Sequence, residues 1–189
     1  AFLLGFPRSG TTLLEKALAG HPQVTTLEER DVLSESGAQL LADDAALRAL
    51  AVLPDAQADT LRQTYWRGVR AAAGADLTGR VLIDKLPLHT VSLPLIARLF
   101  PDARVLFALR DPRDVVLSNY MQIFRAPAYA RMCERLDSTA QGYAVAFMAW
   151  NAFASLFRLD LLQTRHEDVV DDVAGFSRRL CEFLGLEWS

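Results

Sequence analysis

The segment G-F-P-R-S-G-T-T, which starts at Gly5, constrains the fold most, because an apolar run precedes it and a helix-forming run follows it. Residues 1–5 predict a strand and residues 11–19 predict a helix, with a tight loop between them. Gly5 and Gly10 have the spacing of a phosphate-binding P-loop, but Thr11 stands where that motif has lysine. Such a loop points backbone N–H groups at an anion. The missing lysine indicates a phosphate-bearing ligand that needs no clamp on β- and γ-phosphates.

Composition sets the class of protein. The 189 residues are 51% hydrophobic and 23% charged, which suits a single domain, residues 1–189, with a sizeable core. The net charge of −3 does not suggest a nucleic-acid binder. The longest apolar stretch, residues 144–157, is too short to span a membrane. Cys133 and Cys181 fit no metal-binding pattern, so no metal site is expected.

Strands and helices alternate along the chain, which predicts an α/β fold with a central parallel sheet of about five strands flanked by helices in three layers. The expected strands are residues 1–5, 24–27, 80–84, 104–109 and 161–165. The expected helices are residues 11–19, 37–50, 55–73, 90–100, 112–123, 138–159 and 172–184, with Asp55 and Pro112 at helix starts and Gly185 after the last helix.

Ligands of parallel sheets bind beyond the carboxyl ends of the strands, and four loops are expected to meet there. They are residues 6–12, 28–31, 85–89 and 110–113. Each carries charged or phosphate-binding groups, so their coincidence predicts one anion-binding site better than any single motif does.

The first loop supplies the donors for a phosphate group. Ser9, Gly10, Thr11 and Thr12 can offer N–H groups, and Arg8 adds a forked cation. The loop resembles the 5′-phosphosulfate-binding loop, P-R-S-G-T-T, of sulfotransferases. The similarity continues through L-L at residues 13–14, H-P-Q-V at residues 21–24 and E-E at residues 28–29. The pattern is similar to tyrosylprotein sulfotransferases and to bacterial sulfotransferases joined to tetratricopeptide repeats.

This resemblance implies a P-loop-like fold and a donor, 3′-phosphoadenosine 5′-phosphosulfate (PAPS), that leaves as 3′,5′-bisphosphoadenosine (PAP) without a metal. A second motif, R-D-P-R-D-V-V-L-S, looks like the family's 3′-phosphate-binding sequence. In it Arg110 and Ser118 are spaced to reach one phosphate, while Arg113 is the weaker candidate.

The resemblance also implies two catalytic residues. Glu29 follows Arg8 by 21 residues, as does the base of the tyrosylprotein branch, and Glu28 and His89 are the alternatives. Lys85 precedes Arg110 by 25 residues, and its implied role is to stabilise charge on the bridging oxygen as the S–O bond breaks.

Two other functions remain open. The sequence V-L-I-D, which ends at Asp84, resembles a Walker B strand of a nucleotide kinase or NTPase, with the carboxylate near Mg²⁺. A nucleotide-binding module without catalysis is the other alternative. This alternative is favoured if the chain is a piece of a longer protein, because the piece would then lack the segment that closes over the donor in family members.

The acceptor is expected to carry a hydroxyl group on a protein tyrosine, a glycan or a small molecule. Its cleft is expected within residues 30–75 and 119–140. The aromatic candidates for the cleft are Tyr65, Trp66, Tyr120, Phe124 and Tyr129, and the basic ones are Arg125, Arg131 and Arg135. Tetratricopeptide repeats in the parent chain are a further implication, as is a cytoplasmic location if the source is bacterial.

Overall fold

A five-stranded parallel sheet forms the centre of the molecule in the computed structural model, which describes residues 1–37, 39–74 and 76–188. The strand order is β2-β3-β1-β4-β5. The strands are β1 (Phe2–Gly5), β2 (Val24–Glu28), β3 (Val81–Lys85), β4 (Arg104–Leu109) and β5 (Asp160–Arg165). The expected α/β class and strand number are therefore confirmed.

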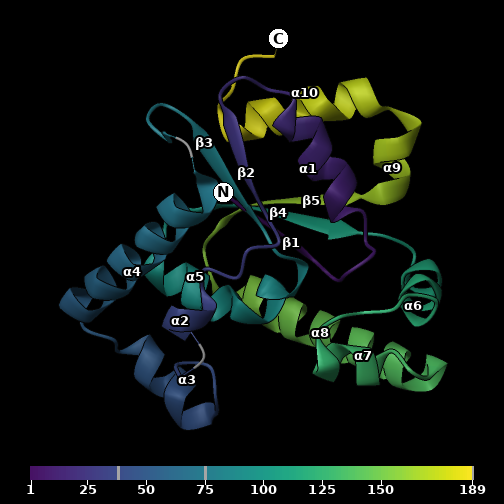
Figure 1. Ribbon diagram of the computed structural model, residues 1–189, viewed down its shortest axis with the longest axis horizontal. Coiled ribbons are helices and arrows are strands. Elements are labelled where there is room, and N and C mark those ends of the chain that lie inside the picture. Colours follow the sequence, from purple (N-terminus) through teal and green to yellow (C-terminus); the bar gives the residue numbers. More distant parts are fainter. Residues whose placement is uncertain (38, 75, 189) are drawn as a thin grey trace.

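Helices cover both faces of this sheet and complete three layers (Figure 1). On one face lie α1 (Thr11–Ala19), α9 (His166–Asp171) and α10 (Val173–Leu184). The other helical segments are α2 (Ser34–Gly37), α3 (Asp44–Ala51), α4 (Asp55–Ala73), the 3₁₀ segment η1 (Pro87–Ser92), α5 (Leu93–Leu99), α6 (Pro112–Tyr120), α7 (Pro127–Met132) and α8 (Leu136–Leu156). Of these, α4, α5 and α8 pack on the opposite face of the sheet.

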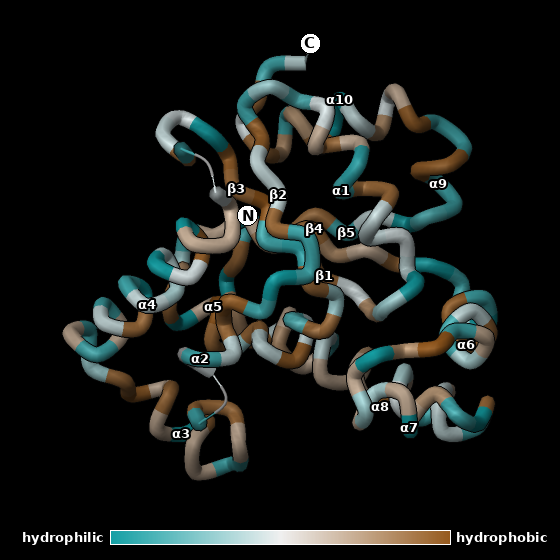
Figure 2. Tube along the Cα trace, in the orientation of Figure 1, coloured by the Kyte–Doolittle hydropathy of each residue, from teal (hydrophilic) through white to brown (hydrophobic). Residues whose placement is uncertain are grey.

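Alternation along the buried strands divides the core in two. Phe2 and Leu4 of β1 face the cluster under α4, α5 and α8, whereas Leu3 faces the cluster under α1 and α10. Strand β4 repeats this with Phe107 and Leu106 on opposite faces, and the ring of Phe107 stacks on Trp150 at 3.5 Å. Figure 2 shows the strands as mostly hydrophobic and the outer helices as mixed. A sheet buried on both faces requires such continuously apolar strands.

The register aligns the carboxyl ends of the central strands. Gly5 pairs with Ala108 across β1 and β4, and Glu28 pairs with Lys85 across β2 and β3. The hydroxyl of Thr90 donates to the carbonyl of Gly5 at 2.8 Å, which ties η1 to the end of β1. The loops after β1, β2, β3 and β4 therefore open onto one edge of the sheet, as the sequence predicts.

Two expected helices are built differently from the prediction. The helix expected over residues 37–50 is replaced by α2 and α3, and its residue 38 lies outside the described residues. Asp43 starts α3 by accepting from the amide of Ala46 at 2.8 Å, which makes a new helix begin there. The helix expected over residues 90–100 begins as η1, and α5 starts only at Leu93, because Pro94 has no N–H for an earlier turn.

Asp55 does not cap α4 as expected. Pro54 occupies the N-cap position without a side-chain bond, and the carboxylate of Asp55 instead accepts from Arg98 at 2.8 Å. The other two terminal predictions are confirmed. Pro112 lies in the first turn of α6, and Gly185 ends α10 in the left-handed conformation with φ 68°.

Candidate functional site

The loop between β1 and α1 has the shape of an anion cradle. Gly10 is the N-cap of α1 at φ 100°, and Arg8 also has a positive φ of 71°. A Cβ at position 10 would lie 2.7 Å from Nδ1 of His166, so only glycine fits this turn. Thr11 and Thr12 follow in the first helical turn, where backbone N–H groups have no partner within the helix. The loop therefore presents the positive end of α1 to the cleft.

Ser9 plays a different part in this loop. Its amide donates to the carbonyl of Phe6 at 3.1 Å and closes the turn. Its hydroxyl is buried, has no hydrogen-bond partner among the described residues, and lies beneath the loop beside Gly5. Ser9 is not among the residues that line the cleft, so in this structure it shapes the loop from behind.

Arg8, Arg110 and Ser118 come together from three separate segments. The Nε of Arg8 donates to Oγ of Ser118 at 3.0 Å, and a guanidinium N–H of Arg110 donates to the carbonyl of Arg8 at 3.4 Å. Arg110 also pairs with Asp114 at 3.3 Å, one turn into α6. The spacing predicted from the sequence thus brings two guanidinium groups and a hydroxyl to one place.

The turn that carries Arg110 is held by acidic residues. Asp111 caps α6 by accepting from the amide of Arg113 at 2.9 Å, and Glu167 accepts from the amide of Asp111 at 2.9 Å. The guanidinium of Arg113 folds back onto Asp111 at 2.7 Å, and these hydrogen bonds hold the pKa of that carboxyl well below its usual range. Arg113 is 89% exposed, so its side chain lies in solvent.

Lys85 and Glu29 form the second element of the site, at the ends of β3 and β2. The Nζ of Lys85 donates to Oε1 of Glu29 at 3.0 Å. The amide of Glu29 donates to the carbonyl of Lys85, also at 3.0 Å, and holds Glu29 at a left-handed φ of 48°. The side chain of Glu29 is 60% exposed and lines the cleft, whereas Lys85 is only 3% exposed beneath it. Glu28 is exposed and is not among the lining residues.

His89 lies outside the cleft lining, in a buried row of polar groups. Its ring nitrogens are 3.7 Å from Asp84 and 3.6 Å from Asp31, and Asp84 accepts from the hydroxyl of Tyr65 at 2.9 Å. Burial raises the pKa of Asp84, and the nearby ring of His89 lowers the pKa of Asp31. The row links the sheet core to the surface loop after β2.

A cleft of about 480 Å³ lies at the carboxyl edge of the sheet; Arg8, Glu29 and Arg110 line it, whereas their partners Ser118 and Lys85 do not. Its lining residues are Pro7, Arg8, Gly10, Thr11, Thr12, Glu29, Leu86, Pro87, Leu88, Arg110, Phe124, Ala126, Tyr129 and His166. Such a volume suits a small-molecule ligand. The polar side chains gather on the β1–α1 loop, and apolar ones come from η1 and from the start of α7.

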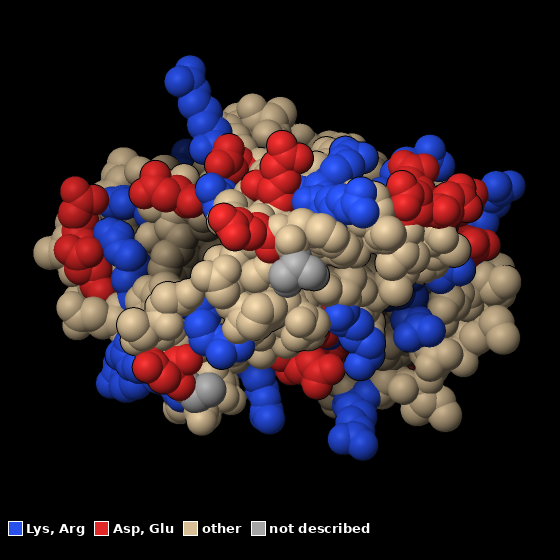
Figure 3. Space-filling view, turned by 90° about the horizontal axis from the view of Figure 1, so that it is seen from above, with Lys and Arg blue, Asp and Glu red and all other residues tan. Residues whose placement is uncertain are grey.

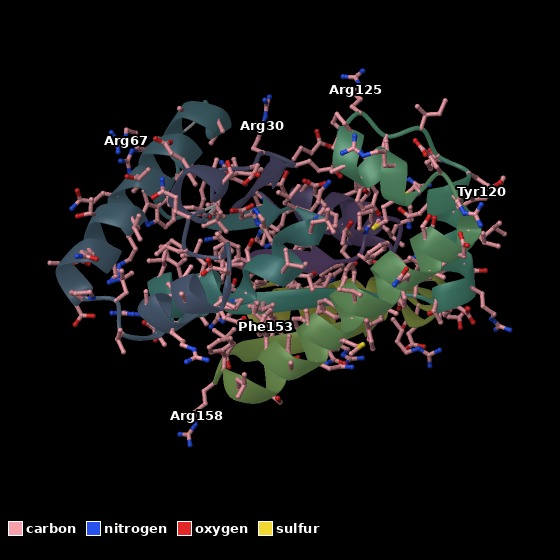
Figure 4. All side chains as sticks on the ribbon, turned by 90° about the horizontal axis from the view of Figure 1, so that it is seen from below. Arg30, Arg67, Tyr120, Arg125, Phe153 and Arg158 are labelled. Carbon is pink, nitrogen blue, oxygen red and sulfur yellow. The ribbon has the colours of Figure 1, made fainter. Side chains whose placement is uncertain are left out.

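Of the aromatic candidates, Phe124 and Tyr129 line the cleft and pack edge to face at 4.6 Å. Tyr65 is a core residue and Trp66 packs beside it, so both differ from the sequence expectation. Tyr120 points to solvent at the end of α6 (Figure 4).

Two arginines, Arg30 and Arg125, are neighbours in sequence of residues that line the cleft. Figure 4 shows both side chains extending outward from the same edge of the molecule. Of the other basic candidates, Arg135 pairs with Asp137 at 2.8 Å. On the face seen in Figure 3, acidic and basic side chains are interspersed.

Two residues of the site were not anticipated. Glu15 is buried and lies 3.1 Å from Nζ of Lys85. Its position on the buried stripe of α1, between Leu14 and Leu18, is the sequence signal that could have identified it. His166 lies in the cleft lining, and its Nδ1 has no partner among the described residues. Nothing in its sequence context distinguishes it from a structural histidine.

Within residues 1–37, 39–74 and 76–188, no group of three or more His, Cys, Asp or Glu side chains is placed to hold a metal ion. Across the same part of the chain, no helix combines the length and apolar character needed to cross a bilayer.

Curated relatives resemble this chain in sequence. It is 28% identical over 198 residues to "Protein-tyrosine sulfotransferase 2" of Gallus gallus, an alignment that covers 100% of this chain and 51% of the relative. It is 32% identical over 130 residues to "Nodulation protein NoeE" of Sinorhizobium fredii, covering 62% of this chain and 30% of that protein. The chain thus spans about half, or less, of the length of these relatives.

Solved structures share the fold. The sulfotransferase domain from the curacin biosynthetic pathway superposes with a TM-score of 0.67 at 22% identity, covering 100% of this chain and 74% of that one. The sulfotransferase domain of the Synechococcus PCC 7002 olefin synthase gives a TM-score of 0.58 at 25% identity, covering 100% and 73%. The P-loop-like architecture expected from the sequence is therefore confirmed.

A family model agrees with both kinds of likeness. The model described as "Sulfotransferase family" matches residues 1–189, and the matched region includes both segments predicted to bind phosphate and the Lys85–Glu29 pair. This chain belongs to the sulfotransferase family.

Proposed function

We propose that the protein transfers a sulfuryl group from PAPS to an acceptor hydroxyl. One observation carries the proposal: a single cleft holds a helix N-terminal anion cradle, a paired-arginine site and an accessible carboxylate bonded to a buried lysine. A donor with phosphates at both its 5′ and 3′ positions needs two anion sites. Membership of the sulfotransferase family implies such a donor, PAPS.

The donor would lie across the β1–α1 loop. In this proposal the amides of Gly10, Thr11 and Thr12 bind the 5′-phosphosulfate, where the dipole of α1 favours negative charge. Arg110 and Ser118 bind the 3′-phosphate, with Arg8 between the two sites. Ser9 keeps the loop in shape from below.

The transfer would use the two charged groups at the ends of β2 and β3. Glu29 takes the proton of the acceptor hydroxyl, and the acceptor oxygen forms a bond to sulfur. The bond from sulfur to the bridging phosphate oxygen breaks in line, and PAP leaves with the added negative charge on that oxygen. Lys85 stabilises this charge, an interaction that becomes stronger as the charge develops. The charges balance without a metal.

Phe124 and Tyr129 line the same cleft as Glu29, and we assign them to its acceptor side. This surface favours an acceptor with an aromatic or otherwise flat body. The likeness to a protein-tyrosine sulfotransferase supports a phenolic hydroxyl as the first acceptor to test, with glycans and small alcohols next.

The nucleotide kinase alternative is less well supported by the geometry. The carboxylate of Asp84, which would have to approach Mg²⁺, is fully buried and accepts a hydrogen bond from Tyr65. Thr11 also leaves the loop without the lysine that such enzymes place on β- and γ-phosphates.

The direct test is transfer of label from [³⁵S]PAPS to a tyrosine peptide, a phenol and an oligosaccharide, each with and without EDTA. The proposal expects a labelled acceptor and stoichiometric PAP in at least one mixture, unaffected by EDTA. A protein that binds PAP but labels no acceptor would be a binding module. One that hydrolyses ATP only with Mg²⁺ would be an NTPase.

A further inference from the structure

The ammonium group of Lys85 lies between two carboxylates of very different surroundings. Glu29, from the end of β2, is 3.0 Å away and 60% exposed. Glu15, from α1, is 3.1 Å away and 2% exposed. Two negative charges and one positive charge therefore meet at the base of a cleft that binds an anion in the proposed function.

Glu15 depends on Lys85 for its compensation. It lies on the buried face of α1 among apolar residues, and neither of its carboxylate oxygens has an aligned hydrogen-bond donor among the described residues. A buried carboxylate without a cation is strongly unfavourable, so the ion pair with Lys85 holds both groups in place. Glu29 has water as an alternative partner and does not depend on Lys85 in this way.

We propose that Glu15 is a positioning residue, the fixed counter-ion that holds the ammonium group of Lys85 in place while Glu29 separates from it. The inference rests on the proposed function, in which Glu29 must leave Lys85 to take the acceptor proton. Without Glu15, separation of Glu29 would leave a buried ammonium group with no counter-ion, so Glu29 would be bound to Lys85 instead of free to act. With Glu15, Lys85 keeps one carboxylate and turns its other N–H groups toward the donor.

The composition of the chain allows a test that needs neither donor nor acceptor. Lys16 and Lys85 are the only lysines, and Lys16 is exposed on the same helix as Glu15. Competitive labelling with acetic anhydride, read by mass spectrometry, gives the reactivity of Lys85 relative to Lys16. We expect Glu15→Gln to raise this ratio several-fold, because the buried carboxylate that holds the Lys85 side chain in an ion pair is gone. Glu29→Gln should raise it less.

Glu35→Gln is the matched control, since it removes an exposed carboxylate from α2 and should leave the ratio unchanged. If Glu15→Gln leaves the ratio at the wild-type value, or if Glu29→Gln raises it more, Glu15 is not the fixed counter-ion. If Glu15→Gln does not fold, Glu15→Asp serves instead. Restored folding in the double variant Glu15→Gln/Lys85→Gln would then support the dependence of the two charges on each other, and failure to restore it would count against it.

A second readout separates positioning from simple loss of structure. Glu15→Gln removes a negative charge near the donor site, so PAP should bind several-fold more tightly, while kcat should fall between about tenfold and a hundredfold because Lys85 and Glu29 remain paired. A damaged fold would weaken both. Parallel losses in both quantities would overturn the proposal. Absence of PAP binding in the wild type would instead overturn the proposed function and leave the labelling result to decide the role of Glu15.

Discussion

Lys85 and Glu29 are joined twice, once through their side chains at 3.0 Å and once through the backbone, where the amide of Glu29 donates to the carbonyl of Lys85 at 3.0 Å. The backbone hydrogen bond fixes the position of the Glu29 main chain. The exposed side chain of Glu29 can still change conformation. This places an accessible carboxylate beside a buried cation, which is the arrangement on which the proposed transfer depends.

Glu29→Gln should lower the transfer rate by about 10²- to 10⁴-fold, the usual contribution of a general base, while PAP still binds. The measurement is kcat with [³⁵S]PAPS and the best acceptor, alongside the Kd for PAP from calorimetry. Glu28→Gln is the control, because Glu28 is the preceding residue and is also exposed, but does not line the cleft. A larger rate loss in Glu28→Gln would move the base to that residue.

Arg110→Ala should weaken PAP binding by about tenfold to a hundredfold, the range for a charged hydrogen bond of ~1.5–3 kcal/mol. Adenosine 5′-phosphate, which has no 3′-phosphate, should lose little affinity. Arg113→Ala is the matched control, since that guanidinium is 89% exposed and bonded to Asp111. An equal loss for both nucleotides would show that Arg110 does not bind the 3′-phosphate.

Gly10→Ala should reduce the free energy of unfolding by about 1–3 kcal/mol, the range for strained backbone positions. Its φ is 100°, and the added Cβ would meet the ring of His166 at 2.7 Å. Gly74→Ala tests conformation alone, because Gly74 has φ 60° and nothing within 4 Å of an added Cβ. Urea unfolding of both variants gives the comparison. If Gly74→Ala lowers the free energy of unfolding more than Gly10→Ala does, the close approach of His166 does not restrict residue 10 to glycine.

Asp84→Asn should stabilise the protein more at pH 7 than at pH 4. Burial raises the pKa of Asp84, so the folded state opposes its ionisation, although His89 and the hydroxyl of Tyr65 partly favour the charged form. The loss of folding stability caused by the raised pKa is absent below about pH 3.9, the pKa of aspartate in the unfolded chain. It grows as the pH rises through the higher pKa of Asp84 in the folded protein. Asparagine removes it.

Urea unfolding of Asp84→Asn at pH 4 and pH 7, with Asp102→Asn as an exposed control, measures this difference. A gain in stability that is equal at both pH values would contradict the assignment of a raised pKa to Asp84.

The sequence predicted the parts of the site that local order determines. A strand, a glycine loop and a helix in succession place Thr11 and Thr12 at a helix start, and parallel strands bring Arg110 to the same edge. The pairing of Glu15 with Lys85 could not be predicted in this way, because it depends on how α1 packs over β3. Nor could the short helices α7 and α9, which are fixed by contacts with the rest of the fold and have too few residues for a clear period.

The central claim is that this cleft binds a nucleotide with phosphates at both the 3′ and 5′ positions, without a metal. Isothermal titration of the wild-type protein with PAP, adenosine 5′-phosphate and ADP, each with and without Mg²⁺, tests it most directly. We expect one PAP per chain, bound more tightly than either other nucleotide and unaffected by Mg²⁺. Folded protein that binds no PAP, or that prefers ADP with Mg²⁺, would contradict the claim.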